Sequence, residues 1–205
     1  MTVLLLASPL AAEDLRLAAL GDSLTQGYGL PPNDGFVPQL EDWLRTQGAN
    51  VSVMNAGVSG DTTAGGLSRV AWTLTDDVDA MIVALGGNDL LRGIDPAASR
   101  ANLSGILDAA AAKDVEVLLV GMEAPGNYGP DFKAAFDAMY PELAERDGVT
   151  LFPDFFQGLT TEGDRAAAIQ AFMQPDGIHP NKDGVQRIVG AMGPAVLDLL
   201  QRVQN

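Results

Sequence analysis

The sequence predicts a single α/β domain with three layers, α/β/α, in which helices cover both faces of a parallel sheet. Apolar segments of strand length alternate about five times with longer segments of helical period along the chain. The segment 80–85 (AMIVAL) is apolar without interruption, as is typical of a strand that is covered on both faces. This alternation implies that the strands are parallel and are joined by right-handed crossovers.

The elements follow one another in a regular order. The predicted strands are residues 15–20, 51–55, 80–85, 115–120 and 149–152. Apolar side chains spaced by three and four residues predict helices over residues 36–44, 67–74, 103–110, 132–143 and 185–203. Gly48 and Gly148 end two of these helices. We therefore expect a flavodoxin-like, five-stranded parallel sheet.

Composition and charge exclude several classes of site. The 205 residues are 47% hydrophobic and 19% charged, which is typical of a folded globular chain. The absence of cysteine excludes disulfides and a thiol nucleophile, and the single histidine excludes a histidine-rich metal site. Twelve Lys and Arg against 27 Asp and Glu give a net charge of −15, which argues against nucleic acid as a partner.

The first residues resemble part of a secretion signal. Residues 3–12 (VLLLASPLAA) are apolar and end in small residues, although no Lys or Arg precedes them. The run is too short to cross a bilayer, so we expect no stable membrane insertion. We expect residues 1–12 to be the remnant of a signal, residues 13–205 to form the single domain, and the location to be periplasmic or secreted. The alternatives are an ordinary first element of the fold and a cytoplasmic location; the sequence predicts no oligomeric state.

Function is expected in the loops that follow the strands, because ligands of open parallel sheets bind beyond the carboxyl ends of the strands. These loops are residues 21–29, 55–63, 86–93, 121–129 and 153–180.

The only histidine, His179, lies in the last of these loops, in the sequence PDGIHP. Asp176 precedes it by three residues, and Gly177 between them permits a tight turn. A carboxylate on one imidazole nitrogen fixes the tautomer and supports the imidazolium that forms when the other nitrogen takes a proton. The alternative is a purely structural turn before the last helix.

Ser23 stands three residues after the first predicted strand, in the sequence GDSLT. A serine there lies where backbone N–H groups can point at the group it attacks, but it needs a neighbouring base, and His179 is the one imidazole in the chain. The alternative is a helix N-cap. The sequence lacks the G-x-S-x-G elbow, which argues against the α/β-hydrolase fold.

Two further loops offer hydrogen-bond donors. In GGND, Asn88 supplies a neutral amide donor, which suits an oxyanion, and Gly60 in SGDT can present an unobstructed backbone N–H. Tight turns remain the alternative for both loops. We assign Asp22, Asp61 and Asp89 to loop structure.

Taken together, GDSL (21–24), Gly60, GGND (86–89) and DGIHP (176–180) resemble the SGNH/GDSL hydrolase family, and most closely its bacterial arylesterase, thioesterase I and lysophospholipase branch. The resemblance covers the chain from about residue 15 to the last helix. It implies that Ser23 is the nucleophile, His179 the general base and Asp176 its orienting carboxylate. It further implies an oxyanion hole made by the Ser23 and Gly60 N–H groups and the Asn88 amide, with no metal and no organic cofactor.

The resemblance implies a serine esterase that acts on short-chain acyl or aryl esters, with thioesters or lysophospholipids as further small-molecule substrates. Loop 121–130 is similar to the loop that lines the acyl site in the thioesterase I branch. The candidate substrate-binding residues are Asn127, Tyr128, Phe156 and Ile178. Segment 153–175 is long enough to form a lid or a short helix near 165–172, and its apolar residues, including Ile169, line a pocket or belong to the core.

Two other functions remain open. One is a carbohydrate O-acetylesterase or acyltransferase that uses the same catalytic residues, although Trp43 and Trp72 fall in predicted helices and offer no aromatic platform for a sugar. The other is a binding or signalling module of flavodoxin-like fold. A phosphate-receiver domain would carry an acidic cluster and a lysine at its strand ends, whereas these strand ends carry Ser, Gly and Asn.

Overall fold

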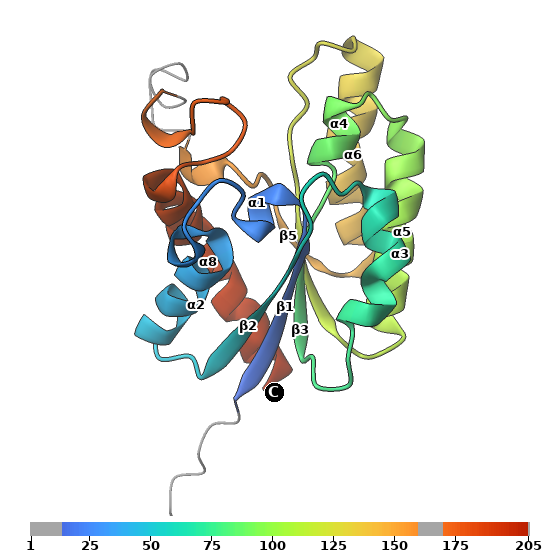
Figure 1. Ribbon diagram of the computed structural model, residues 1–205. Coiled ribbons are helices and arrows are strands. Elements are labelled where there is room, and N and C mark those ends of the chain that lie inside the picture. The colour runs from blue at the N-terminus through green and yellow to red at the C-terminus, as the bar shows by residue number, and fades with distance from the viewer. Residues whose placement is uncertain (1–13, 160–169, 205) are drawn as a thin grey trace, which may run out of the picture.

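The computed structural model describes residues 14–159 and 170–204, which form a five-stranded parallel sheet covered by helices on both faces (Figure 1). The sheet order is β2-β1-β3-β4-β5, which confirms the predicted flavodoxin-like order. The strands are β1 (Leu15–Gly21), β2 (Val51–Gly57), β3 (Ala80–Ala84), β4 (Glu116–Val120) and β5 (Thr150–Phe152).

The helices form the two outer layers. Helices α2 (Phe36–Thr46) and α8 (Lys182–Val203) pack against each other on one face of the sheet. Helices α3 (Thr63–Thr73), α5 (Pro96–Ala111) and α6 (Pro130–Asp147) cover the opposite face (Figure 1). The three-layer α/β/α arrangement is therefore as the sequence predicts.

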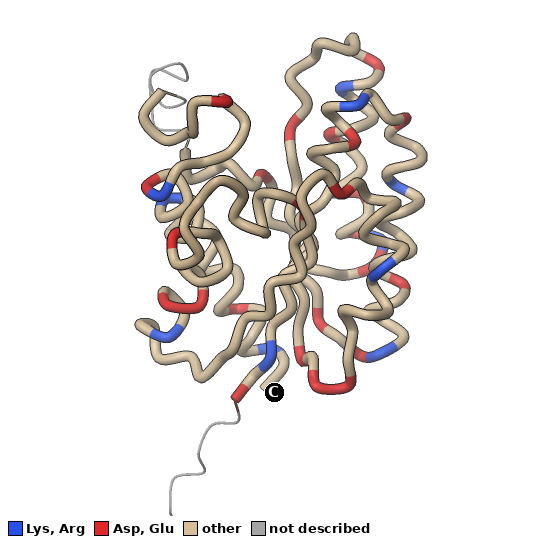
Figure 2. Tube along the Cα trace, viewed as in Figure 1, with Lys and Arg blue, Asp and Glu red and all other residues tan. Residues whose placement is uncertain are grey.

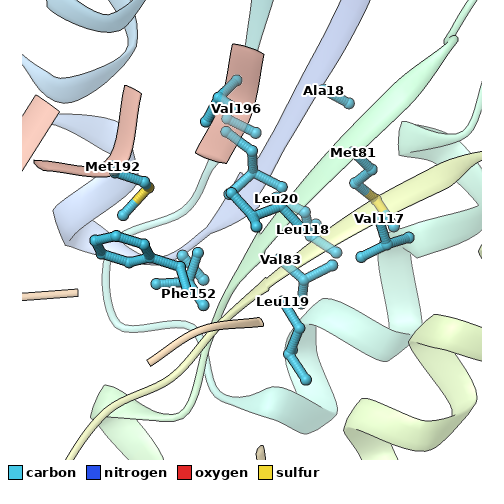
Figure 3. Close-up of a cluster of buried hydrophobic side chains, with 14 of the residues drawn as sticks. Ala18, Leu20, Met81, Val83, Val117, Leu118, Leu119, Phe152, Met192 and Val196 are labelled. Carbon is cyan, nitrogen blue, oxygen red and sulfur yellow. The ribbon is translucent and has the colours of Figure 1, made fainter. Parts of the chain in front are cut away.

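The core lies between the sheet and these layers. Every residue of β3 is buried, as its uninterrupted apolar sequence predicts. In the middle of the sheet, Leu20 of β1 is in register with Val83 of β3, which is in register with Leu119 of β4. Met192 and Val196 of α8 lie beside the apolar side chains of the sheet in Figure 3. Both are fully buried, so this contact fixes the last helix against the strands.

Charge is confined mainly to the surface. Lys, Arg, Asp and Glu lie over the helices and loops in Figure 2, and few lie along the strands. Among the described residues, Asp22 and Asp89 are the buried charged side chains, and both lie in loops at the carboxyl edge of the sheet. Of the helices in the described ranges, none is both long and apolar enough to cross a membrane.

The structure corrects the predicted boundaries at several points. Two loops contain single helical turns, α1 (Ser23–Gln26) and α4 (Gly87–Leu91), and 3₁₀ turns occur at η1 (Pro32–Asp34) and η2 (Gln157–Leu159). Such turns are too short to show an apolar period. Strand β2 extends two residues beyond its predicted end, because Ala56 and Gly57 pair with the end of β1. Segment 1–12, most of the predicted helix near 165–172 and Ile169 lie outside the described residues.

Candidate active site

The loops after β1, β2 and β3 begin side by side at the carboxyl edge of the sheet. Gly21 is in register with Gly57 on one side and with Ala84 on the other. Side chains that follow these three positions are therefore brought together, although Gly21 and Ala84 are 63 residues apart along the chain.

Ser23 is the first residue of α1. The side chain of Asp22 is its N-cap and accepts a hydrogen bond from the Leu24 backbone N–H at 3.0 Å. Gly27 ends the turn in the left-handed conformation, with φ +85°. This local structure holds the Ser23 side chain at the mouth of the first loop.

His179 and Asp176 form a tight turn of their own. Oδ1 of Asp176 accepts from the backbone N–H groups of Ile178 at 2.9 Å and His179 at 3.0 Å, while Oδ2 lies 2.7 Å from Nδ1 of His179. Gly177 has φ +67°, which the turn requires. The backbone N–H of His179, then its ring, then the Ile178 N–H lower the pKa of Asp176 to about 2. The carboxylate is therefore ionised at neutral pH.

The ring of His179 bridges Asp176 and Ser23. Its Nε2 lies 2.9 Å from Oγ of Ser23, a contact across 156 residues of sequence. Because an ionised carboxylate can only accept, Nδ1 carries the proton and donates to Asp176. Nε2 of the neutral ring is then the acceptor of the Ser23 hydroxyl proton, so the imidazole is placed to take that proton.

Asn88, in the first turn of α4, reaches the same loop. Its Nδ2 donates to Oδ2 of Asp22 at 3.1 Å. The carboxylate accepts and cannot donate, so this bond fixes which end of the Asn88 amide faces the Ser23 loop. The second N–H of the same amide remains for another acceptor.

The turn that carries Gly60 is held from two sides. Gly60 has φ +80°, and its carbonyl accepts from Nη2 of Arg92 at 2.8 Å. Asp61 is paired with Nε of Arg69 at 2.6 Å, and the other guanidinium nitrogens of Arg69 donate to the carbonyls of Ala56 and Gly21. Within residues 14–159 and 170–204, the backbone N–H groups of Ser23 and Gly60 donate to no other group.

A buried polar network lies behind Asn88. Asp89 is fully buried and accepts from the Thr63 backbone N–H at 2.8 Å and hydroxyl at 2.5 Å, and from the Ser99 hydroxyl at 2.8 Å. These bonds join α4 to the start of α3 and to α5, so the carboxylate is fully satisfied. The contacts of Asp22, Asp61 and Asp89 agree with the loop roles that the sequence predicts.

Burial makes the carboxyl group of Asp22 a weaker acid than usual. Desolvation raises its pKa from the ordinary 3.8 to about 6, against the hydrogen bonds from Leu24 and Asn88 and the nearby imidazole, all of which lower it. The folded state thus binds a proton more tightly than the unfolded state, and this carboxyl makes the protein less stable as pH rises from about 4 to about 6.

We expect Asp22→Asn to remove that pH dependence, because asparagine caps the helix without a charge. The free energy of unfolding of the variant, relative to the wild type, should increase by roughly 2–3 kcal/mol between pH 4 and pH 7. Urea denaturation across this pH range measures the difference, with the exposed Asp42→Asn as control. A difference that stays constant with pH would contradict a buried, ionised Asp22.

The predicted substrate residues divide into two groups. Asn127, Tyr128 and Ile178 are exposed in the loops at the carboxyl edge, and the Tyr128 hydroxyl donates to the Leu91 carbonyl at 3.2 Å. The ring of Phe156 is partly buried and packs against Phe155 and the hydrophobic core, and its role in substrate binding stays a prediction. Burial of an aromatic ring stabilises the fold, so Phe156 also contributes to packing.

Some residues of this edge are not indicated by any motif. Arg92 binds the Gly60 carbonyl, and the ring of Tyr28 lies 4.7 Å from that of His179, centroid to centroid. Their contacts are made with backbone carbonyls and a ring from other loops. Only the pairing of the loops in space reveals them.

The fold has three layers, α/β/α, and at the carboxyl edge of its sheet a hydrogen-bonded chain runs from a serine through an imidazole to a carboxylate. Together with its relatives, this defines the class of the protein: it is a serine hydrolase. The profile of the GDSL-like Lipase/Acylhydrolase family matches residues 19–187. The chain therefore belongs to the GDSL-like lipase/acylhydrolase family, as its motifs predict.

Individual relatives agree with this assignment. Esterase TesA of Pseudomonas aeruginosa is 36% identical over 201 residues, which cover 98% of this chain and 96% of that protein. An arylesterase of Vibrio mimicus is 34% identical over 169 residues, covering 82% of this chain and 81% of that protein. The crystal structure of AlinE4, an SGNH-hydrolase family esterase, matches with a TM-score of 0.74 and 42% identity, covering 93% of this chain and 99% of that one.

Proposed function

We propose that this protein is a serine esterase that hydrolyses short-chain acyl or aryl esters through an acyl-enzyme intermediate. Ser23 is the nucleophile, His179 the general base and then acid, and Asp176 the carboxylate that orients the ring. The single observation that carries the proposal is the hydrogen-bonded chain from Ser23 Oγ through the imidazole to Asp176.

In acylation, Ser23 Oγ attacks the ester carbonyl carbon while its proton passes to Nε2 of His179. The carbonyl π bond opens, and the negative charge moves to the oxygen. As the tetrahedral intermediate collapses, the bond to the alcohol oxygen breaks and the imidazolium returns the proton to that oxygen. Asp176 stays ionised throughout, since its low pKa keeps the carboxylate available to stabilise the imidazolium.

In deacylation the same groups act on water. His179 removes a proton from water, the hydroxide oxygen bonds to the acyl carbon, and the collapse of the second intermediate returns the proton to Ser23 Oγ. The products are the carboxylic acid and the free serine. Neutral hydrogen-bond donors around the developing oxyanion lower the barriers to acylation and to deacylation.

The oxyanion is bound by the backbone N–H groups of Ser23 and Gly60 and by the side-chain amide of Asn88. The free state of the two backbone donors supports this role, as does the orientation that Asp22 imposes on the amide. Neutral donors suit the site because they stabilise a developing negative charge and keep their protons.

The apolar edge of the site supports an aryl or short acyl substrate. Five exposed large apolar side chains lie in the loops at this edge: Tyr28, Val58, Leu91, Tyr128 and Ile178. Such side chains offer contact area to an apolar ester and leave its carbonyl within reach of the loops. The names esterase and arylesterase borne by two relatives agree with this substrate class.

A serine-directed fluorophosphonate tests the proposal most directly. We expect stoichiometric covalent labelling, with the modified peptide containing Ser23, and turnover of p-nitrophenyl acetate and butyrate in excess of that of acetylated xylan. Labelling at another serine would contradict the assigned nucleophile. A preference for acetylated xylan would instead favour the carbohydrate O-acetylesterase alternative.

A further inference from the structure

The segment that carries His179 closes on itself as a short hairpin. Met173 and Pro180 form an antiparallel bridge, and the Gln174 backbone N–H donates to the His179 carbonyl at 2.7 Å. Asp176, inside the hairpin, holds the imidazole. The distance between His179 and Asp176 is therefore set within the hairpin, whereas the distance to Ser23 depends on how the hairpin is attached to the first loop.

The side chain of Gln174 makes that attachment. Its Nε2 donates to the Tyr28 carbonyl at 2.8 Å, in the first loop, and to the Pro180 carbonyl at 3.0 Å, in the hairpin. A Cβ on Gly29 would come within 2.3 Å of Gln174 Oε1, so the amide fits closely against a position where glycine leaves room.

The first loop continues the connection to Ser23. The Tyr28 backbone N–H donates to the Ser23 carbonyl at 3.1 Å, and the Tyr28 ring lies against the imidazole of His179. A closed circuit results, which runs from Ser23 to Tyr28, to Gln174, to His179 and back to Ser23 Oγ. Each link of it is a hydrogen bond.

We infer that Gln174 is a positioning residue that sets the distance between Ser23 Oγ and His179 Nε2. The inference rests on the proposed function. Its bond to the Tyr28 carbonyl holds the hairpin against the first loop, and its bond to the Pro180 carbonyl fixes the amide within the hairpin, so that proton transfer starts from a formed hydrogen bond. Loss of the bonds lets the hairpin move as a unit, with the pairing of His179 and Asp176 intact. A displacement of about 1 Å at a reacting group can lower the rate by about 100-fold.

The test replaces Gln174 with methionine, which keeps the length and bulk of the side chain and removes its donors. We expect the rate of fluorophosphonate labelling and kcat for p-nitrophenyl butyrate to fall by about 10- to 100-fold, with KM within about twofold of wild type. The midpoint of the pH–rate profile should not move, because the contacts between Asp176 and His179 lie inside the hairpin. Gln174→Glu should lower the labelling rate and kcat in the same way, since its carboxylate also cannot donate; the comparison of pH midpoints is made with the uncharged Gln174→Met alone.

Gln39→Met is the matched control. Gln39 also donates its Nε2 to two carbonyls, those of Asp34 at 2.7 Å and Lys182 at 3.2 Å, and joins α2 to the start of α8; both acceptors lie outside the hairpin 173–180. We expect this variant to be labelled at the wild-type rate. Thermal melting of all three variants establishes that each is folded.

Three results would overturn the inference: labelling of folded Gln174→Met at the wild-type rate, an equal loss in Gln39→Met, or a shifted pH midpoint. The first shows that the bonds are dispensable, the second that any loosened loop has this effect, and the third that the Asp176 contact is disturbed. Failure of the wild type to be labelled at all would instead refute the proposed function itself, and is recognised before any variant is made.

Discussion

Ser23→Ala should lower ester turnover by about 10⁴- to 10⁶-fold and leave the protein folded. The hydroxyl is the proposed nucleophile, so no acyl-enzyme can form without it. Its bonding partner is the imidazole of His179, whereas the cap of α1 is supplied by Asp22, so the helix does not depend on the hydroxyl. Steady-state hydrolysis of p-nitrophenyl butyrate measures the loss, and circular dichroism with urea denaturation measures the fold.

Ser68→Ala is the control for this substitution. Ser68 is an exposed serine of α3 whose hydroxyl donates to the Gly65 carbonyl within its own helix. Its loss should leave turnover unchanged. Adding His179→Ala to Ser23→Ala should lower the rate little further, because residues that act as one unit are not additive. Turnover near the wild-type rate in Ser23→Ala would refute the mechanism.

Asn88→Ala is expected to lower kcat by about 100- to 1,000-fold, equivalent to about 3–4 kcal/mol of transition-state stabilisation. The amide donor is proposed to bind the oxygen that becomes negative, and this bond is strongest in the transition state. KM should change much less than kcat. A rise in KM at constant kcat would show that Asn88 binds the ground state and would contradict an oxyanion role.

Asp22→Asn extends this prediction to the residue that orients the amide. In the wild type, Asp22 accepts a hydrogen bond from Nδ2 of Asn88. In the variant, the new side-chain N–H₂ group would face that same Nδ2, so two donors would meet and the Asn88 amide would turn or move away. We therefore expect a lower kcat in a protein whose stability relative to the wild type rises between pH 4 and pH 7. Asn102→Ala removes a different amide donor, one that binds the Thr63 hydroxyl, and serves as the control with unchanged kcat.

The fold was predictable because burial leaves a periodic mark on the sequence. The uninterrupted apolar run of β3 requires cover on both faces of the strand, and the helical spacing of apolar residues in α8 requires cover on one face of the helix. The structure confirms both expectations. The turns α1 and α4 were not predicted as helices, since four or five residues show no period. For Phe156 the sequence leaves substrate binding and core packing open, because an aromatic residue in a long loop suits a pocket as well as a core.

The sequence by itself determined which residues are proposed to carry the chemistry: Ser23, Asn88, Asp176 and His179 stand in short motifs after predicted strands, and local turns fix their immediate geometry. Only the tertiary structure decided how these motifs meet. Four hydrogen bonds join loops that are distant in sequence: His179 to Ser23 at 2.9 Å, Asn88 to Asp22, Arg92 to the Gly60 carbonyl, and Gln174 to the Tyr28 carbonyl. Such contacts depend on the sheet order and on the packing of α8, which bring backbone carbonyls and side chains together. No local pattern in the sequence predicts them, because each partner lies in a different loop.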